Sequence, residues 1–249
     1  MHGRTRPPAW GTGPRLLRAI EQELLPRRCV FCGAAMRHTG RFLCAGCDAD
    51  LQRNTPACPL CALPLPAASN GPCGECQRRR LPFTAVHAPL AYEFPTDAAI
   101  KAFKFHRRLF YVPAFADILC AAAAALPSGI DAVLPVPLHR WRKLRRGFNQ
   151  ARELALPVAR HLALPVLECV RRRRHTPYQS GLPAADRRRN LEGAFEVSGR
   201  IEARHVLLVD DVVTTGTTCR QIALLLKQHG VRDVSVLALA RANAAEVRR

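Results

Sequence analysis

The chain of 249 residues has few aromatic side chains, few lysines and no long apolar run. Aromatic residues make up 6% of it, which disfavours a dedicated single-strand-binding protein, because such proteins stack bases on aromatic rings. No apolar run approaches the ~20 residues of a membrane span, so we expect no membrane insertion. None of the lysines follows a glycine-rich loop, which excludes a P-loop nucleotidase. The first residues do not resemble a secretory signal.

Acidic residues are also scarce, with 19 against 38 basic ones, and the excess charge is unevenly placed. His139–Asn190 holds fourteen arginines or lysines against three acids. Such a concentration favours a polyanionic partner, which is a pyrophosphate-bearing substrate, a nucleic acid or both. For any single arginine, a solvated surface position is the alternative.

The cysteines are concentrated near the N-terminus, in two copies of one pattern. Eight of the eleven form Cys-x2-Cys pairs, and the spacing Cys-x2-Cys-x11-Cys-x2-Cys recurs after 29 residues. Two such pairs supply the four thiolates of a structural zinc site, which leaves no open position for catalysis. We predict two structural Zn²⁺ ions, one held by Cys29, Cys32, Cys44 and Cys47 and the other by Cys58, Cys61, Cys73 and Cys76.

Two alternatives accompany this zinc hypothesis. The spacing alone also permits an interleaved arrangement, in which one ion takes cysteine pairs from both copies. A disulfide framework is disfavoured, because the phosphate chemistry indicated below is typical of a reducing cytoplasm, where we expect this protein.

Cys120, Cys169 and Cys219 lie in apolar or helical surroundings and are predicted to be buried small residues.

The pattern along the chain predicts three regions, which are an amphipathic extension over 1–25, a double zinc-ribbon module over 26–82 and an α/β domain over 83–249. In the last region we predict strands over 85–92, 131–136, 166–170, 206–209 and 234–240, and helices over 96–105, 113–126, 148–162 and 219–229. Alternating strands and helices predict a mostly parallel sheet with helices on both faces. Pro157 is expected to kink or shorten its helix.

The most informative segment is 206–218. Val206–Val209 predicts a buried strand, and two carboxylates follow at its carboxyl end, where ligands bind in α/β sheets. A turn of threonines around one glycine then leads into a helix, and helix N-termini bind phosphate. We predict that Asp210 and Asp211 are catalytic and that the phosphate is bound by Thr214, Thr215, Gly216, Thr217 and Thr218. A plain strand, turn and capped helix is the alternative.

A second predicted strand ends in two prolines and leads into a cationic run. A rigid strand end followed by arginines suits a loop that holds pyrophosphate. The residues assigned to this loop are Pro135, Val136, Pro137 and Leu138, with Arg145 and Arg146 as catalytic cations. Gly147, Phe148, Asn149 and Gln150 then predict a sharp turn at a helix start.

Two other polar segments are candidates. The cationic stretch from Arg174 to Phe195 suits a mobile lid that excludes water when substrate binds. Lys101, Lys104 and His106 lie on a short basic helix, for which a solvent-exposed face is an equally good interpretation.

Residues 206–218 resemble the signature with which type I phosphoribosyltransferases bind phosphoribosyl pyrophosphate (PRPP). This signature consists of a hydrophobic run, two acids and T-T-G-x-T. From about residue 26 to 241, the chain also resembles the ComF family, which carries a double zinc ribbon, P-V-P-L, R-G-F-N-Q, R-x-x-T-x-x-Q-x-x-L, R-x-x-N and the PRPP motif in this order. Besides Arg146 and the four residues after it, the positions that match are Thr176, Gln179, Arg187 and Asn190.

This resemblance implies a type I phosphoribosyltransferase fold in the cytoplasm and, in some bacteria, a link to natural transformation. Single-stranded DNA and a competence helicase-like protein are the partners that it implies. The substrate of the family is poorly defined, so the resemblance narrows the fold more than the reaction.

Two functions follow from these patterns. The first is Mg²⁺-dependent transfer of 5-phosphoribose from PRPP to an unidentified nitrogen nucleophile, with Asp210 and Asp211 on the ribose hydroxyls and the threonine loop on the 5-phosphate. The second is a non-catalytic adaptor that binds single-stranded nucleic acid through arginines and retains the phosphate loop. We assign no general base.

Overall fold

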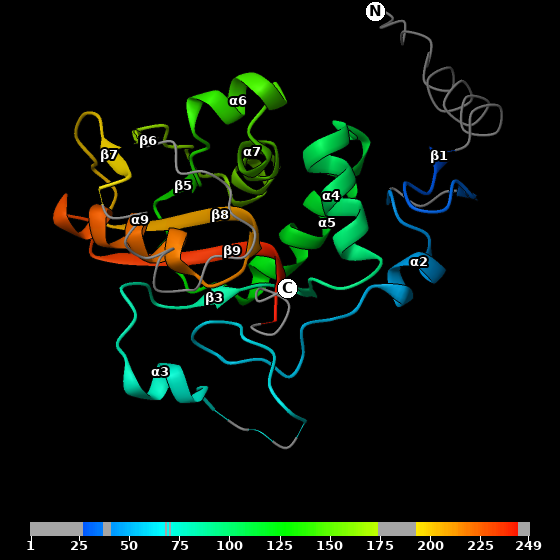
Figure 1. Ribbon diagram of the computed structural model, residues 1–249, viewed down its shortest axis with the longest axis horizontal. Coiled ribbons are helices and arrows are strands. Elements are labelled where there is room, and N and C mark those ends of the chain that lie inside the picture. Colours follow the sequence, from blue (N-terminus) through cyan, green and yellow to red (C-terminus); the bar gives the residue numbers. More distant parts are fainter. Residues whose placement is uncertain (1–26, 37–40, 68, 70, 174–192, 244–249) are drawn as a thin grey trace, which may run out of the picture. The chain divides into compact units, whose positions relative to one another are not determined.

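The computed structural model describes residues 27–36, 41–67, 69, 71–173 and 193–243 (Figure 1). The chain separates into two compact units, Met1–Asp48 and Ala49–Arg249, so the two cysteine clusters fall in different units. The predicted extension over 1–25 lies outside the described residues, as does most of the predicted lid, including Thr176, Gln179, Arg187 and Asn190.

In the first unit, a short antiparallel pair joins β1 (Arg27–Arg28) to β2 (Ala35–Met36). Between the two strands, the N–H of Gly33 donates to the carbonyl of Cys29 over 2.8 Å, and Gly33 adopts a φ of 74°. Glycine takes this left-handed conformation without strain, which allows the tight turn. Helix α2 (Ala45–Asp50) follows and continues past the boundary between the units.

The second unit begins with the second cysteine cluster, which includes α3 (Gly74–Arg78). Cys58, Cys73 and Cys76 are buried against leucines of the same segment. This segment is tied to the sheet, since the N–H of Val86 donates to the carbonyl of Leu60 over 3.0 Å. Ala62 and Phe83 also belong to the main apolar core.

A parallel sheet forms the centre of the second unit. Its strands are β3 (Val86–His87), β4 (Leu90–Ala91), β5 (Ala132–Pro135), β8 (His205–Val213) and β9 (Asp233–Arg241). The order is β3-β9-β8-β5, β4 also pairs with β9, and every pair is parallel. The predicted mostly parallel sheet is confirmed.

The strand predicted over 85–92 is divided into β3 and β4 by Ala88 and Pro89. Proline has no N–H to donate, and both carbonyls here turn to Asn54 instead. The Asn54 side-chain amide donates to Ala88 over 3.0 Å, and its backbone N–H donates to Pro89 over 2.9 Å.

Helices cover both faces of the sheet (Figure 1). They are α4 (Thr96–His106), α5 (Val112–Ala122), α7 (Gln150–Leu162) and α9 (Thr217–Gln228), with short 3₁₀ turns at Leu109–Tyr111 and Ala123–Ala125. In α9, Ile222 and Leu226 share a core with Leu208 of β8. Leu207 points to the opposite face because side chains alternate along a strand, and α5 and α7 pack together there.

Other local predictions also differ from the structure. The strand predicted over 166–170 is wrong, since only Val166 bridges to Val133, and the chain instead forms a separate hairpin of β6 (Val170–Arg172) with β7 (Phe195–Val197). The cationic run predicted as a loop forms helix α6 (Arg140–Arg146). It lacks an apolar stripe, but His139 caps its N-terminus and Gly147, with a φ of 87°, ends it. Finally, α7 continues through Pro157, so the shortening is wrong.

Candidate functional site

Asp210 and Asp211 lie on β8 itself, because the strand continues to Val213 instead of ending at Val209. Each carboxylate accepts the N–H of the following residue, from Asp211 to Asp210 Oδ1 and from Val212 to Asp211 Oδ1, both over 2.8 Å. Asp211 is 3% exposed. These bonds fix the pair at the carboxyl end of the strand, where open α/β sheets bind their ligands.

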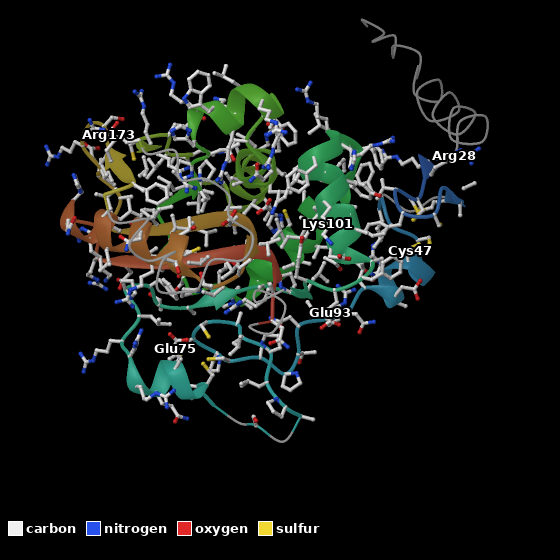
Figure 2. All side chains as sticks on the ribbon, in the orientation of Figure 1. Arg28, Cys47, Glu75, Glu93, Lys101 and Arg173 are labelled. Carbon is white, nitrogen blue, oxygen red and sulfur yellow. The ribbon has the colours of Figure 1, made fainter. Side chains whose placement is uncertain are left out.

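Lys104 of α4 supplies a cation to this pair, with Nζ 2.8 Å from Asp211 Oδ2. Its neighbour Lys101, labelled in Figure 2, is exposed and instead pairs with Asp97 on the same helix, with Nζ 2.6 Å from Oδ2. His106 is exposed. Of the three basic residues of this helix, the structure therefore brings Lys104 alone to the acid pair.

Burial and charge set the ionisation of this cluster. Burial raises the pKa of Asp210 well above its ordinary value, and the charge of Asp211 raises it further, while Lys104 opposes both effects. Burial alone would lower the pKa of Lys104, but attraction by Asp211 and Asp210 outweighs it and raises that pKa. Two carboxylates thus share one ammonium group, which suits a ligand that brings hydroxyl donors or a cation.

The threonine loop joins β8 to α9. Thr214 and Thr215 are exposed, and Gly216 takes a φ of 71° immediately before the helix. The helix begins at Thr217, two residues earlier than predicted, and the Thr215 and Thr217 hydroxyl oxygens lie 2.8 Å apart. The N–H groups in the first turn of a helix have no partner within it, so this loop presents backbone and hydroxyl donors to an anion.

Arg241, at the end of β9, binds the backbone of the threonine loop through its side chain. It is 6% exposed, and its guanidinium donates to the carbonyls of Val213 over 3.1 Å and of Thr214. Its Nε donates to the carbonyl of Cys61 over 2.9 Å. One buried side chain therefore contacts both the threonine loop and the second cysteine cluster.

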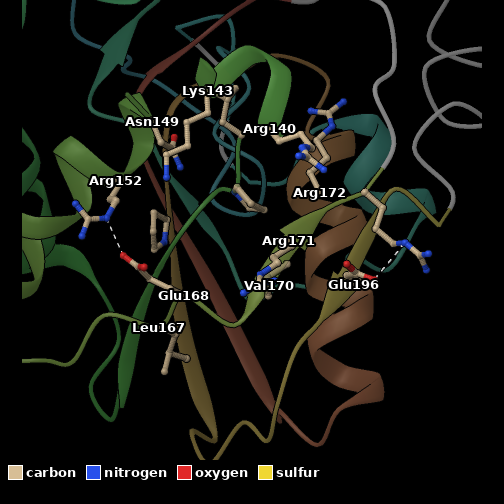
Figure 3. Close-up of a pocket in the computed structure, with 14 residues that line it drawn as sticks. Arg140, Lys143, Asn149, Arg152, Leu167, Glu168, Val170, Arg171, Arg172 and Glu196 are labelled. Carbon is tan, nitrogen blue, oxygen red and sulfur yellow. Dashed lines mark hydrogen bonds and ion pairs between the residues drawn. The ribbon is translucent and has the colours of Figure 1, made fainter. Parts of the chain in front are cut away.

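A cavity of about 690 Å³ lies at the carboxyl end of β5 (Figure 3). Strand β5 and the residues after it, α6, α7 and the β6–β7 hairpin all contribute to its wall. It is lined by Pro135, Pro137, Leu138, Arg140, Lys143, Asn149, Arg152, Leu167, Glu168, Val170, Arg171, Arg172, Arg173 and Glu196. Six of these residues are basic and two are acidic, so the cavity favours anions.

Both acids of the cavity are already paired, as the dashed lines in Figure 3 show. Glu168 Oε1 lies 2.7 Å from Arg152 Nε, and Glu196 Oε2 lies 3.3 Å from Arg173 Nε. Burial lowers the pKa of Arg172 to about 10, repulsion by Arg142 contributes, and Asp210 opposes the shift. Asp210 therefore interacts electrostatically with Arg172, which lines the cavity.

The structure brings some of the predicted loop residues into this wall and leaves others out. Val136 is buried behind the lining, and its carbonyl accepts the Asn149 side-chain amide over 3.1 Å. Arg145 and Arg146, which are predicted to be catalytic, do not line the cavity. Arg140 and Lys143 of the same helix line it instead.

Arg146, the last residue of α6, is engaged by other side chains. Its Nη1 donates to Gln150 Oε1 over 2.6 Å, and its guanidinium stacks over the Phe105 ring at 5.2 Å. Phe148 packs its ring 5.4 Å from that of Phe103. Gly147 ends α6.

Sequence reasoning missed Arg172 and Arg241, and it left Lys104 undecided. Arg241 has one signal in the sequence, as the first charged residue after the apolar run of β9. Nothing in the sequence separates Lys104 from Lys101, or Arg172 from its arginine neighbours.

Each cysteine cluster is arranged as a tetrahedral metal site. In Cys29, Cys32, Cys44 and Cys47, and again in Cys58, Cys61, Cys73 and Cys76, the four sulfurs lie within 4.8 Å of one another. The sulfurs of Cys61 and Cys73 are 3.7 Å apart, which is far beyond a disulfide bond and close to the ~3.8 Å edge of a ZnS₄ tetrahedron with ~2.3 Å bonds. The sequential grouping of the cysteines is the one that the structure shows.

Backbone donors prepare these sulfurs for a metal. The N–H of Cys73 donates to Cys58 Sγ over 3.3 Å, and that of Cys44 donates to Cys29 Sγ over 3.4 Å. Burial opposes ionisation of Cys58, but such N–H donors outweigh it and lower its pKa to about 7. Burial and neighbouring thiols raise the pKa of Cys76, so the cluster needs a cation to ionise fully. Both clusters are therefore sites for Zn²⁺.

Comparison with known proteins agrees with both parts of this description. Residues 20–77 match the double zinc ribbon domain, and residues 145–249 match the phosphoribosyl transferase domain. Competence protein F of Haemophilus influenzae is 34% identical over 227 residues, which cover 86% of this chain and 97% of that protein. This chain belongs to the ComF family.

Other relatives place the chain in the same family. The DNA utilization protein YhgH of Escherichia coli K12 is 35% identical over 87% of this chain and 98% of its own length. Competence protein ComFC of Streptococcus pneumoniae is 25% identical over 86% of this chain and its own whole length. Among the described residues of this ComF protein, no helix is long and apolar enough to cross a membrane.

Proposed function

We propose that this protein binds PRPP together with Mg²⁺ and transfers its 5-phosphoribosyl group to a nitrogen nucleophile. The observation that carries the proposal is the arrangement at the carboxyl ends of β8 and β5. An acid pair, a phosphate-binding loop and a cationic cavity occur together there, and each suits one part of PRPP.

The acid pair and the loop would bind the sugar phosphate. Backbone N–H groups and hydroxyls of residues 214–218 bind the 5-phosphate at the N-terminus of α9. Asp210 and Asp211 accept hydrogen bonds from the ribose 2- and 3-hydroxyls. Lys104 holds Asp211 in place for this role.

The cavity would hold the leaving pyrophosphate. Arg140 and Lys143 of α6 line it, beside the proline-rigidified end of β5. As the bond from ribose to pyrophosphate lengthens, positive charge develops on the sugar and negative charge on the leaving group. These cations then stabilise the departing oxygens. Mg²⁺ bound together with PRPP would supply further charge stabilisation to the pyrophosphate.

The β6–β7 side of the cavity would receive the acceptor. Arg171, Arg172 and Arg173 of this region line it, and Arg173 pairs with Glu196. The six basic and two acidic residues of the lining favour an acceptor with a negative charge of its own. We assign no general base. Phosphate chemistry and two thiolate-rich metal sites together suit a reducing cytoplasm, where we place the protein.

The test is the double variant Asp210→Asn with Asp211→Asn. We expect it to lose PRPP binding measured by calorimetry with Mg²⁺, while circular dichroism and zinc content match the wild type. Unchanged affinity would rule the assignment out. A screen for pyrophosphate release with PRPP and a panel of nitrogenous acceptors, anionic and neutral, then identifies the acceptor class.

A second candidate function is binding of single-stranded nucleic acid, and an exposed surface favours it. Phe105 and Trp141 are each 62% exposed, and Phe110 is 47% exposed. Arginines accompany two of these rings, with Arg146 over Phe105 and Arg108 at 5.9 Å over Phe110. Aromatic rings beside arginines are typical of surfaces on which bases stack. The relatives named for competence and DNA utilization agree with such a role.

Oligonucleotide titration with and without PRPP separates the two functions. Competition would place the nucleic acid at the phosphate site, whereas independent binding would place it on the aromatic surface. Trp141→Ala should then weaken oligonucleotide binding and leave PRPP binding unchanged. An oligonucleotide affinity that Trp141→Ala does not alter would count against this surface.

A further inference from the structure

We propose that Arg241 is a positioning residue that couples the second zinc site to the phosphate loop. In this proposal the second zinc site supports binding of the 5-phosphate, and the first does not. The inference rests on the proposed function, because it concerns how the loop of that site is held.

The geometry begins with a buried guanidinium that donates to four carbonyl oxygens. Arg241 donates to Val213 and Thr214 on the loop side, to Ala242 over 2.6 Å, and to Cys61 on the cysteine side. Cys61 lies 180 positions away in the sequence. The fork of the guanidinium spans both sides at once, which the single ammonium group of a lysine does not.

These bonds determine which way the loop donors point. In a planar trans peptide, the carbonyl and the following N–H point in opposite directions. Because Arg241 draws the carbonyls of Val213 and Thr214 inward, the N–H groups of Thr214 and Thr215 are turned outward. The N–H of Ala242 also donates to Val213, over 3.0 Å, which holds the first of these peptides from a second direction. The loop is thus preorganised before an anion arrives.

The charge of Arg241 points to the same connection. Within the described part of the chain, no carboxylate forms an ion pair with it. A Zn²⁺ ion with four thiolates carries a net negative charge, and Cys61 is one of those ligands. The guanidinium next to it therefore acts as a counter-charge for the second zinc site. Loss of this metal would remove the anion that favours Arg241 in its buried position.

The internal repeat of the sequence provides a matched control. Cys47 and Cys76 occupy the same position in the two cysteine patterns, but Cys47 belongs to the first unit and Cys76 to the second. Cys47→Ser and Cys76→Ser therefore remove one equivalent ligand from each site. Arg241→Lys keeps the charge at the proposed junction and removes the fork.

The experiment measures binding of ribose 5-phosphate and of pyrophosphate separately by calorimetry, with zinc content determined for each variant. Arg241→Lys should weaken ribose 5-phosphate binding by about tenfold or more, because hydrogen bonds from a charged group position the loop. Pyrophosphate binding should stay near the wild-type value, and both zinc ions should remain. Cys76→Ser should reproduce the selective loss, whereas Cys47→Ser should bind like the wild type.

Three results would overturn the coupling. They are wild-type ribose 5-phosphate affinity in Arg241→Lys, an equal loss for both ligands, and equal effects of Cys47→Ser and Cys76→Ser. The last comparison decides the matter even where Arg241→Lys does not fold. A wild-type protein that binds neither PRPP nor ribose 5-phosphate would instead refute the proposed function, and the positioning role with it.

Discussion

The ammonium group of Lys104 lies 2.8 Å from a carboxylate oxygen of Asp211, which joins helix α4 to the end of strand β8. The side chain of Lys104 is 18% exposed and that of Asp211 is 4% exposed, so the pair is largely shielded from water. The second acid, Asp210, has no cation to itself in this cluster, and its pKa is raised by burial and by Asp211. The two acids therefore affect folding in opposite ways.

Asp210→Asn should stabilise the protein at neutral pH. The raised pKa means that the ionised carboxylate costs folding free energy above the ordinary pKa of aspartate, and asparagine removes that cost. We expect a gain of about 1 kcal/mol in the free energy of unfolding, which is the usual size for a stabilising single substitution. Urea unfolding measures it. Asp211→Asn should instead destabilise the protein, because Lys104 loses its partner.

The same shift predicts a pH dependence. Asp210 contributes to stability at low pH, where its carboxyl is protonated, and this contribution is lost as the pH rises through its raised pKa. The stability difference between Asp210→Asn and the wild type should therefore grow with pH. PRPP affinity of the wild type should also rise with pH, because the ionised carboxylate accepts the ribose hydroxyl. A stability difference that stays flat as the pH rises from the ordinary pKa of aspartate, about 4, to neutrality would contradict the assignment.

Lys104→Met should cost about 3 kcal/mol of stability, because it leaves Asp211 buried without a cation, and it should weaken PRPP binding. Lys101→Met on the same helix is the control. Its pair with Asp97 is more than half exposed on the lysine side, and such pairs contribute less than about 1 kcal/mol. Thermal unfolding and calorimetry compare the two variants. Equal losses of stability and PRPP binding in the two variants would show that the substitution of a lysine in this helix, and not the loss of the ion pair with Asp211, causes them.

His139 should position two parts of the cavity wall, the start of α6 and the backbone of Arg173. It is 3% exposed, its Nδ1 accepts the N–H of Trp141 over 3.3 Å, and its Nε2 lies 3.3 Å from the carbonyl of Arg173. His139→Ala should lose about 1 kcal/mol from the missing helix cap and should weaken pyrophosphate binding. His139→Asn retains a capping side chain, so it should recover the stability of α6 but not the connection to Arg173. Calorimetry with pyrophosphate distinguishes these outcomes.

Metal analysis should find two zinc ions for each chain. Cys29→Ser and Cys58→Ser should each reduce this number toward one, since each removes a ligand from a different cluster. Only Cys58→Ser should lower the unfolding temperature of the sheet, because its cluster packs in the second unit. A single zinc ion in the wild type would contradict the prediction of two sites.

The local patterns of the chain were sufficient for much of this description. The repeat of cysteines predicted two four-thiolate sites, and the structure decided for the sequential grouping over the interleaved one. The apolar run from Val206 to Val209 and the threonine turn predicted a buried strand, a loop and a helix, all of which the structure contains. These features depend on residues close together in sequence, where backbone geometry leaves few choices.

Only the tertiary structure decided which cations serve the site. Fourteen basic residues between His139 and Asn190 look alike in the sequence, yet Arg140 and Lys143 line the cavity while Arg146 packs on Phe105. Lys104 reaches Asp211 and Arg241 reaches Cys61 through contacts between distant segments. Such contacts depend on how helices pack on the sheet, and the same side chain is solvated or buried according to that packing. The sequence alone therefore indicated which kinds of residue gather at the candidate site, and packing determined which of them meet there.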